Sequence, residues 1–455
     1  MKLEEHGFAI EDATRAIEID PGYVKAYYRR ALCQLAVLRP QFAIPDFKKC
    51  LALDPHNKLA KTQLDATTKL LKRMQFEAAI TVGEEKSAVD RCREIIADGG
   101  CDHTEPSYSG PLLPIITPAT KGSQPKYGIN KEFVEGMLKW FKEGKTLPRR
   151  FVWEIVLNTY DILVKEESLI DIPLEEGVIC DVIGDTHGAL TGLPSESHCL
   201  LFNGDFVDRG SWSVEVVTTL FAYKWLYPNR VGLNRGNHET KDMNKVYGFE
   251  GEVRHKHGEQ TYKVRLMVLA LVPLATMVSP RLPPKTSHDA AHGSPILSPE
   301  GRKRFFVVHG GLFSKDGITL DEVRKIDRLG KQPGNEGLMC ELLWTDPQET
   351  NGRGPSKRGV GLGFGPDITK AWCELNSVTG VIRSHEVRQG GYAIEHGGLC
   401  ITVFSAPNYV DQGQNLGAYL RIDAAGERSY HTFKASPHPP LRPMAYSNPG
   451  LAMFG

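Results

Sequence analysis

Six short apolar runs in the second half of the chain each end in a polar residue beside glycine or another turn former. The runs and the residues that follow them are VICDVIG before Asp185 and His187, CLLFNG before Asp205 and Asp208, RVGLNRG before Asn237 and His238, FFVV before His309, GVIRS before His385, and CITVFSAPN before Tyr409. Short apolar runs bounded by turn residues predict buried strands. In layered α/β folds, chemistry collects outside the carboxyl ends of such strands. The pattern therefore predicts an α/β fold in which six strand ends supply one site.

The residues at these strand ends offer only oxygen and nitrogen atoms to a metal. The candidate ligands are Asp185, His187, Asp205, Asn237, His309 and His385. A mixed oxygen and nitrogen set suits Mn, Fe or Zn better than an all-oxygen Ca or Mg site. Two cations bridged by one carboxylate lie about 3.5–4 Å apart, lower the pKa of bound water towards about 7 and hold a phosphate for in-line attack. A single Asp or His at a strand end is more often a cap than a ligand, so the prediction depends on the six occurring together.

The motifs GDTHG, GDFVDRG and RGNHE, followed by VVHGG, IRSHE and SAPNY, resemble those of the phosphoprotein phosphatase family. The similarity extends over about residues 130–445. It implies a metallophosphoesterase-type β-sandwich flanked by helices, in the α/β (α+β) class. It also implies a serine/threonine phosphatase with two divalent metal ions (Mn, Fe or Zn), in which a metal-activated hydroxide attacks the phosphate and no phosphoenzyme forms.

The resemblance also implies a role for each site residue. Asp185, His187 and Asp205 would bind one metal, Asp205 would bridge, and Asn237, His309 and His385 would complete the second. His238 would be the general acid, oriented by Asp208. The substrate-binding residues would be Arg209, Arg358, Tyr409, Asn237 and His385. Simpler explanations stay open for three of these residues: Arg209 could pair with a carboxylate, Arg358 could lie in a solvated basic loop, and Tyr409 could only pack.

The first eighty residues contain an internal repeat. FAIEDATRAIEIDP (8–21) and FAIPDFKKCLALDP (42–55) share identical residues at six positions that lie 34 apart, and Phe76 continues the Phe series. A 34-residue period is typical of tetratricopeptide helix pairs. We therefore predict a partial tetratricopeptide domain over residues 1–80 that opens on the second helix of a repeat, as if truncated at its N-terminus.

The rest of the chain divides by composition. Residues 81–128 are rich in Pro, Gly, Ser and Thr and predict a linker, followed by a catalytic domain over 129–440 and a tail over 441–455. Within the catalytic domain, residues 279–304 predict a disordered insertion. Only three residues separate GDTHG from GLPSE, so a family helix of about two to three turns is expected to be missing there.

Three residues of the N-terminal segment are candidates for partner binding and regulation. In the resembled family, the tetratricopeptide face binds the acidic C-terminus of the ninety-kilodalton heat-shock chaperone, and Lys25 and Arg29 match the last third of that site. A basic, solvated helix face explains the two residues equally well. Glu4 matches a glutamate that contacts the phosphate-binding arginines, so we hypothesise that it inhibits by pairing with Arg209 and Arg358.

Composition narrows the remaining possibilities. Lys+Arg and Asp+Glu balance at 55 each, which disfavours a nucleic-acid binder. The chain has no apolar run long enough for a membrane span, no signal-peptide pattern and nine scattered cysteines, so a cytoplasmic and nuclear protein is expected. The leading function is protein serine/threonine phosphatase acting on phosphoproteins. The alternatives are a catalytically impaired, phosphatase-like scaffold and a phosphodiesterase or nucleotide phosphatase with the same metal core.

Overall fold

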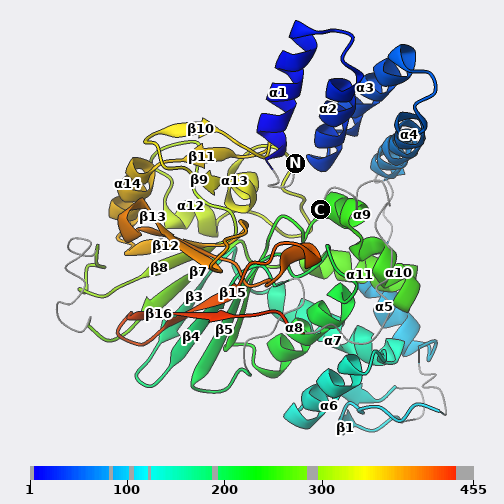
Figure 1. The fold of residues 1–455 in the computed structure, drawn as a ribbon. Helices are drawn as coiled ribbons and strands as arrows, with labels where there is room; N and C mark the ends of the chain where they lie inside the picture. Colours follow the sequence, from blue (N-terminus) through cyan, green and yellow to red (C-terminus); the bar gives the residue numbers. More distant parts are fainter. Residues whose placement is uncertain are drawn as a thin grey trace.

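The computed structural model describes residues 5–80 (backbone only from 76 to 80), 86–101, 107–120, 124–186, 193–283 and 296–436. Figure 1 shows the N-terminal helices, coloured blue, above a β-sandwich that is flanked by further helices. All six strands predicted from the sequence are present in this sandwich.

The N-terminal helices are α1 (His6–Ile19), α2 (Val24–Ala36), α3 (Pro40–Leu53) and α4 (Lys58–Ile80). The repeat matched over 8–21 and 42–55 corresponds to α1 and α3, so both copies form a helix, as the repeat predicts. Small residues allow the helices to approach, because Ala31 of α2 and Ala43 of α3 are fully buried beside Phe47. An ion pair of 2.8 Å between Arg30 and Asp46 adds a polar link between α2 and α3.

The predicted linker contains regular structure. It includes α5 (Ala88–Ala97) and a small hairpin of β1 (Ile115–Thr117) and β2 (Lys126–Tyr127). Ser87 caps α5 by accepting a hydrogen bond from the Asp90 N–H at 3.1 Å. Val89 and Cys92 are buried in the same apolar cluster as residues of α7 (Arg149–Leu163) and α11 (Glu259–Leu269). The helix is therefore stabilised by packing against helices that follow much later in the chain, which composition alone does not reveal.

Two stacked sheets form the sandwich. The first has the order β13-β14-β12-β8-β7-β3 and the second β16-β15-β4-β5-β6. The strands of the first are β3 (Leu169–Leu174), β7 (Ala275–Pro280), β8 (Phe305–Val308), β12 (Gly380–Arg383), β13 (Tyr392–Glu395) and β14 (Cys400–Val403). Those of the second are β4 (Ile179–Ile183), β5 (His198–Asn203), β6 (Val231–Asn234), β15 (Gly417–Ile422) and β16 (Arg428–Phe433).

The six predicted strands are divided equally between the sheets. β4, β5 and β6 are parallel to one another in one sheet, and β8, β12 and β14 are parallel in the other. Apolar side chains between the sheets, including those of Val182, Leu201, Val307 and Ile382, form a shared core. The carboxyl ends of both parallel sets lie at the same edge of the sandwich, because Asp185 after β4 bridges to Phe404 after β14.

Helices cover the outer faces of the sandwich. One group contains α6 (Lys131–Lys142), α7 (Arg149–Leu163), α8 (Ser213–Leu226), α9 (Lys241–Tyr247), α10 (Phe249–His257) and α11 (Glu259–Leu269). The other contains α12 (Leu320–Arg324), α13 (Leu338–Trp344) and α14 (Pro366–Asn376), with a small sheet of β9 (Asp346–Pro347), β10 (Arg353–Pro355) and β11 (Leu362–Phe364). Short 3₁₀ turns are η1 (His396–Gly398) and η2 (Tyr409–Asp411). Within the described residues, none of these helices has the length and apolar character needed to cross a membrane.

The connection after GDTHG is long enough for parallel pairing of β4 and β5. Fourteen residues, 184–197, separate the two strands, and a parallel connection needs about a dozen or more. The pairing runs in register from Ile179 opposite His198 to Ile183 opposite Phe202. Asp181 adds polar links on the outer face, since it accepts hydrogen bonds from Arg421 at 2.7 and 2.8 Å and lies 2.8 Å from His198. β4 is thus bonded to both of its neighbours.

The predicted disordered insertion over 279–304 is too long at both ends. Ser279 and Pro280 belong to β7 and pair with Pro173 and Leu174 of β3. At the other end, Thr379 donates a hydrogen bond to the Ile296 carbonyl at 2.7 Å, and Lys303 is buried with an ion pair of 3.1 Å to Glu427. Contacts with distant segments therefore order both flanks, and residues 284–295 lie outside the described residues.

Candidate active site

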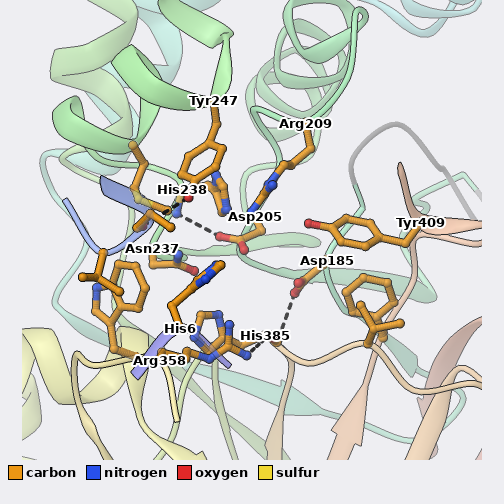
Figure 2. Close-up of a pocket in the computed structure, with 16 residues that line it drawn as sticks. His6, Asp185, Asp205, Arg209, Asn237, His238, Tyr247, Arg358, His385 and Tyr409 are labelled. Atoms are coloured by element: carbon orange, nitrogen blue, oxygen red, sulfur yellow. Dashed lines mark hydrogen bonds between the residues drawn. The ribbon is translucent and has the colours of Figure 1, made fainter. Parts of the chain in front are cut away.

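Polar residues from both sheets meet at the shared carboxyl edge of the sandwich. Figure 2 shows Asp185, Asp205, Asn237 and His385 around one pocket, each following a different strand. All four are at least nine-tenths buried, and His309 at the end of β8 is fully buried behind them. His187, the sixth predicted ligand, lies outside the described residues.

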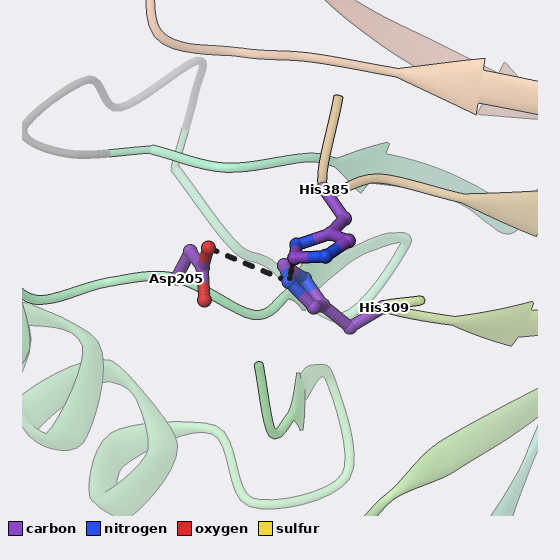
Figure 3. Close-up of side chains that lie close together, drawn as sticks. All are labelled: Asp205, His309 and His385. Carbon is purple, nitrogen blue, oxygen red and sulfur yellow. Dashed lines mark hydrogen bonds and ion pairs between the residues drawn. The ribbon is translucent and has the colours of Figure 1, made fainter. Parts of the chain in front are cut away.

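Three of these side chains converge on the Nε2 atom of His309. It lies 2.9 Å from Asn237 Oδ1, 3.1 Å from His385 Nδ1 and 3.4 Å from Asp205 Oδ2. Figure 3 shows Asp205, His309 and His385 facing one another. Ligand atoms bonded to one cation at about 2.1 Å lie about 3 Å from each other in octahedral geometry. The observed spacings fit that requirement.

The chemistry of this donor set also fits a divalent cation. His309 Nδ1 lies 2.8 Å from the Asn203 carbonyl and donates its hydrogen there, so its Nε2 lone pair points into the cluster. The Asn237 side-chain amide has two possible orientations. When its oxygen Oδ1 points into the cluster, that oxygen faces only acceptor atoms. When its nitrogen points into the cluster instead, the nitrogen donates hydrogen bonds to Asp205, His309 and His385 over 3.2, 2.9 and 3.0 Å. With Oδ1 inward, the converging lone pairs have no donor between them, and a divalent cation at their centre would satisfy them together.

The electrostatics of the cluster indicate surplus negative charge. Burial, followed by repulsion from Asp205, raises the pKa of the Asp185 carboxyl. Burial by itself would lower the pKa of His309, but the charges of Asp205 and Asp185 raise it above its usual range. Without a cation, the two buried carboxylates of Asp185 and Asp205 repel each other. A bound cation would relieve this repulsion.

His238 is held beside the cluster by its backbone and by its ring. Its N–H donates to Asp205 Oδ1 at 3.0 Å, and its Nδ1 lies 2.9 Å from Asp208 Oδ2. Asp208 is fully buried and also accepts hydrogen bonds from Asn244 and the Phe249 N–H. Burial lowers the pKa of His238, but the charges of Asp205 and Asp208 outweigh it and raise the pKa overall. The arrangement favours a protonated imidazole whose Nε2 can exchange a proton with a group in the pocket.

Two arginines and a tyrosine complete the pocket wall. The Arg209 guanidinium carbon lies 4.0 Å from the centre of the Tyr247 ring. Arg358 donates to Asp346 Oδ2 and to the His385 carbonyl, both at 2.7 Å, and is therefore fixed in orientation. Tyr409 lines the same pocket from η2. Their fork-shaped and hydroxyl donors could bind phosphate oxygens between them.

Several site residues have a strained backbone. Asp205, Asp208, Arg209 and His385 have φ angles of 53°, 69°, 62° and 71°, in the left-handed region that residues other than glycine rarely adopt. Such conformations cost about 1–3 kcal/mol each and persist only where the surroundings impose them. Their concentration here shows that the fold imposes the geometry of this site.

The N-terminal helices reach the pocket. His6, Ala36 and Val37 contribute to its lining. The Gly7 N–H donates to the Lys357 carbonyl at 2.6 Å, and Arg39 donates to the Gly359 carbonyl at 2.9 Å. A Cβ at Gly7 would lie 2.5 Å from backbone atoms of Ser356 and Gly359, so only glycine permits this approach.

Among the described residues, the predicted partner-binding pair does not line the pocket. Lys25 and Arg29 are exposed on α2, one turn apart. Glu4 lies outside the described residues. Conversely, the sequence analysis did not predict a role for Tyr247, Trp344 or Asp346, which lie in the segments YGFEGEV (247–253) and LLWTDPQ (342–348).

Comparison with known proteins assigns this fold and site to a class. The calcineurin-like phosphoesterase family model matches residues 181–389, and the PPP5 TPR repeat region matches residues 64–171. The chain therefore contains a metallophosphoesterase domain preceded by a tetratricopeptide segment.

Similar proteins define the family more narrowly. Serine/threonine-protein phosphatase T of Aspergillus oryzae is 45% identical, covering 98% of this chain and 87% of that protein. Human serine/threonine-protein phosphatase 5 is 42% identical, with 98% and 84% covered. A solved serine/threonine phosphatase from Saccharomyces cerevisiae is 37% identical over 70% of this chain and 100% of its own, with a TM-score of 0.61. The chain belongs to the serine/threonine-protein phosphatase 5 family of metal-dependent phosphoprotein phosphatases.

Proposed function

We propose that this chain hydrolyses phosphoserine and phosphothreonine in proteins with two divalent cations (Mn, Fe or Zn). The residues that would hold them are Asp185, His187, Asp205, Asn237, His309 and His385. The observation that carries the proposal is the convergence of Asn237, His385 and Asp205 on His309 Nε2, within 2.9–3.4 Å. When bound, divalent cations lower the pKa of water towards about 7 and offset charge on the phosphoryl group.

Asp205 is suited to the bridging position between the two cations. Its Oδ1 accepts the His238 N–H at 3.0 Å, while its Oδ2 lies 3.4 Å from His309 Nε2. The Asp205 carboxylate thus contacts His238, the proposed general acid, through one oxygen and His309, a proposed ligand, through the other. Asp185 follows β4, the strand next to β5 in the same sheet, and its Oδ1 accepts the His385 N–H at 3.0 Å.

His238 would act as the general acid, with Asp208 as its orienting partner. Because Nδ1 is bonded to Asp208, the proton available to the leaving serine or threonine oxygen resides on Nε2. Arg209 and Arg358 would bind the non-reacting phosphate oxygens, with Tyr409, Asn237 and His385 beside them. Arg358 enters this role already oriented by Asp346, so little side-chain entropy is lost on binding.

The experiment for this proposal compares substrates before and after metal removal. We expect the chelated protein to be inactive on a phosphoserine peptide and to recover when Mn²⁺ is returned, with a phosphotyrosine peptide and bis-p-nitrophenyl phosphate turned over far more slowly. Equal or faster cleavage of the diester would instead identify a phosphodiesterase. Bound metal without turnover of any substrate would identify a phosphatase-like scaffold.

We also propose that the N-terminal helices regulate access to the pocket. Val37 is 3% exposed and packs in one cluster with Met243, Leu343 and Trp344 of the catalytic domain. The Tyr247 hydroxyl donates to the Ala36 carbonyl at 3.1 Å, while the Tyr247 ring lies under Arg209. The docked N-terminal helices therefore cover the pocket. They also contact Tyr247, whose ring lies against Arg209, a proposed phosphate-binding residue.

The substitution Val37→Asp tests this regulation. A carboxylate in the apolar contact costs several kcal/mol unless the helices separate, so we expect basal turnover of a phosphopeptide to rise several-fold. Ile19→Asp is the matched control, because Ile19 is 86% exposed on α1 and should leave turnover unchanged. Unchanged activity in Val37→Asp, with separation of the helices verified by limited proteolysis, would rule out inhibition by docking.

The domain organisation and the cysteines support proposals about partners and cellular location. We propose a partial tetratricopeptide domain over residues 1–80, a catalytic domain over 129–440, and phosphoproteins as substrates. Lys25 and Arg29 would contribute to binding the acidic C-terminus of the ninety-kilodalton heat-shock chaperone, which their exposure supports. The nine cysteines, all within described segments, are free and buried, which supports a reducing compartment such as the cytoplasm and nucleus.

A further inference from the structure

Two neighbouring loops carry the central ligands, and a single buried carboxylate joins them. The ligand loops, as we call them here, are residues 204–209 after β5 and residues 235–240 after β6. We propose that Glu239 is a positioning residue that fixes the ligand loops relative to each other and thereby sets the metal affinity of the site. This inference rests on the proposed two-metal function, but it concerns a residue outside the predicted ligand set.

The carboxylate of Glu239 accepts three backbone hydrogen bonds. Oε2 accepts the N–H groups of Asp205 and Gly236, both at 2.8 Å, and Oε1 accepts the Phe206 N–H at 2.7 Å. Glu239 is fully buried and does not line the pocket, so it lies behind the ligands. Hydrogen bonds from N–H groups to a charged acceptor are about twice as strong as neutral ones. Without this carboxylate, three buried N–H groups would lose a partner.

The ligand loops also approach each other closely at two glycines. A Cβ at Gly236 would lie 2.2 Å from Asp205 Oδ1, and a Cβ at Gly204 would lie 2.5 Å from His309 Nδ1 and 2.7 Å from the Gly236 Cα. The loops therefore have no spare volume between them. A change in the hydrogen bonds of Glu239 cannot be absorbed by local rearrangement without moving Asp205 or Gly236.

The bonds to Glu239 act directly on the proposed bridging ligand. Asp205 has a φ of 53°, and Glu239 accepts its N–H on one side while the His238 N–H is donated to its carboxylate on the other. Glu239 and His238 are adjacent in one ligand loop. That loop therefore accepts one hydrogen bond from Asp205 and donates another to it. This reciprocal pairing sets the separation of Asp205 from Asn237 and hence the size of the metal site.

The test is the substitution Glu239→Gln, with Mn²⁺ as the probe. An amide keeps the shape of the side chain but turns an NH₂ group towards at least one of the three N–H donors. Loss of a partner that orients ligands typically weakens metal binding about 10–100-fold. We expect the Mn²⁺ dissociation constant, measured by calorimetry on the chelated full chain, to rise by that factor. Turnover at saturating Mn²⁺ should return to within a few-fold of the wild-type value, which a merely structural defect would not allow.

Glu252→Gln is the matched control. Glu252 is also fully buried and accepts a backbone N–H, that of Val214 at 3.1 Å, but its ion pair is with Lys256. We expect this control to lose thermal stability while keeping wild-type Mn²⁺ affinity. If Glu239→Gln does not fold, Glu239→Asp keeps the charge, shortens the reach and should show the same weakening.

Two results would overturn the inference, and they are distinguishable. Wild-type Mn²⁺ affinity in a folded Glu239 variant would show that Glu239 does not position the ligands, and would leave the proposed function intact. Absence of Mn²⁺ binding in the unsubstituted chain would overturn the two-metal function and this inference together.

Discussion

Replacing Asp205 by Asn is expected to reduce kcat on a phosphoserine peptide by at least about 10³-fold, since a metal site supplies several kcal/mol of transition-state stabilisation. Asn keeps the shape of the side chain and an oxygen to accept the His238 N–H, but it removes the charge that faces His309 Nε2 at 3.4 Å. The same variant should retain fewer bound metal ions, because Asp205 belongs to the donor cluster with His309 and His385. Turnover and metal content are measured on one preparation.

The control for this variant is Asp321→Asn. The Asp321 side chain is 77% exposed and pairs with Arg324 on α12. Its removal should change neither turnover nor metal content. An Asp205→Asn protein that keeps wild-type turnover and its full metal content would contradict the bridging role.

Replacing His238 by Gln is expected to lower kcat by about 10²–10⁴-fold, the usual contribution of a general acid. Bound metal should be unaffected, because the ring of His238 bonds to Asp208 and not to a proposed ligand. The loss should be large on a phosphoserine peptide, whose leaving oxygen needs a proton, and much smaller on p-nitrophenyl phosphate, whose leaving group departs as an anion.

The ratio of kcat on the phosphoserine peptide to kcat on p-nitrophenyl phosphate is therefore the measurement that isolates the role of His238. Asp208→Asn should move the ratio in the same direction, because it removes the charged partner that orients the ring and raises its pKa. An equal loss on both substrates, or a loss of bound metal, would assign His238 to structure or to metal binding instead.

The sequence pattern predicts the strand ends of the site because that information is local. Each run, such as the one that ends before Asp205, carries its own apolar core and its own turn residues. Pairing between strands is not local, so the pattern does not reveal that β4, β5 and β6 lie in one sheet and β8, β12 and β14 in the other. The structure adds that Asp205 and His309 meet across the sandwich.

The features that sequence analysis missed all depend on distant contacts. Arg39 meets Gly359 across 320 residues, and α5 is ordered by packing against α7 and α11. Glu239 stands inside the recognised motif RGNHE, yet only the structure shows that its carboxylate accepts N–H groups from both ligand loops. Local composition cannot distinguish such a residue from an ordinary buried acid.

The most direct test of the two-metal centre is the number of divalent ions bound per chain, determined together with turnover of a phosphoserine peptide. The donor cluster of Asp205, Asn237, His309 and His385 accounts for one ion, and the proposed ligands Asp185 and His187 add a second, so two ions are expected per chain. It also predicts that both ions and all activity disappear on chelation and return together when Mn²⁺ is restored. Full turnover by a chain that holds less than one ion, or two bound ions with no turnover, would contradict the account.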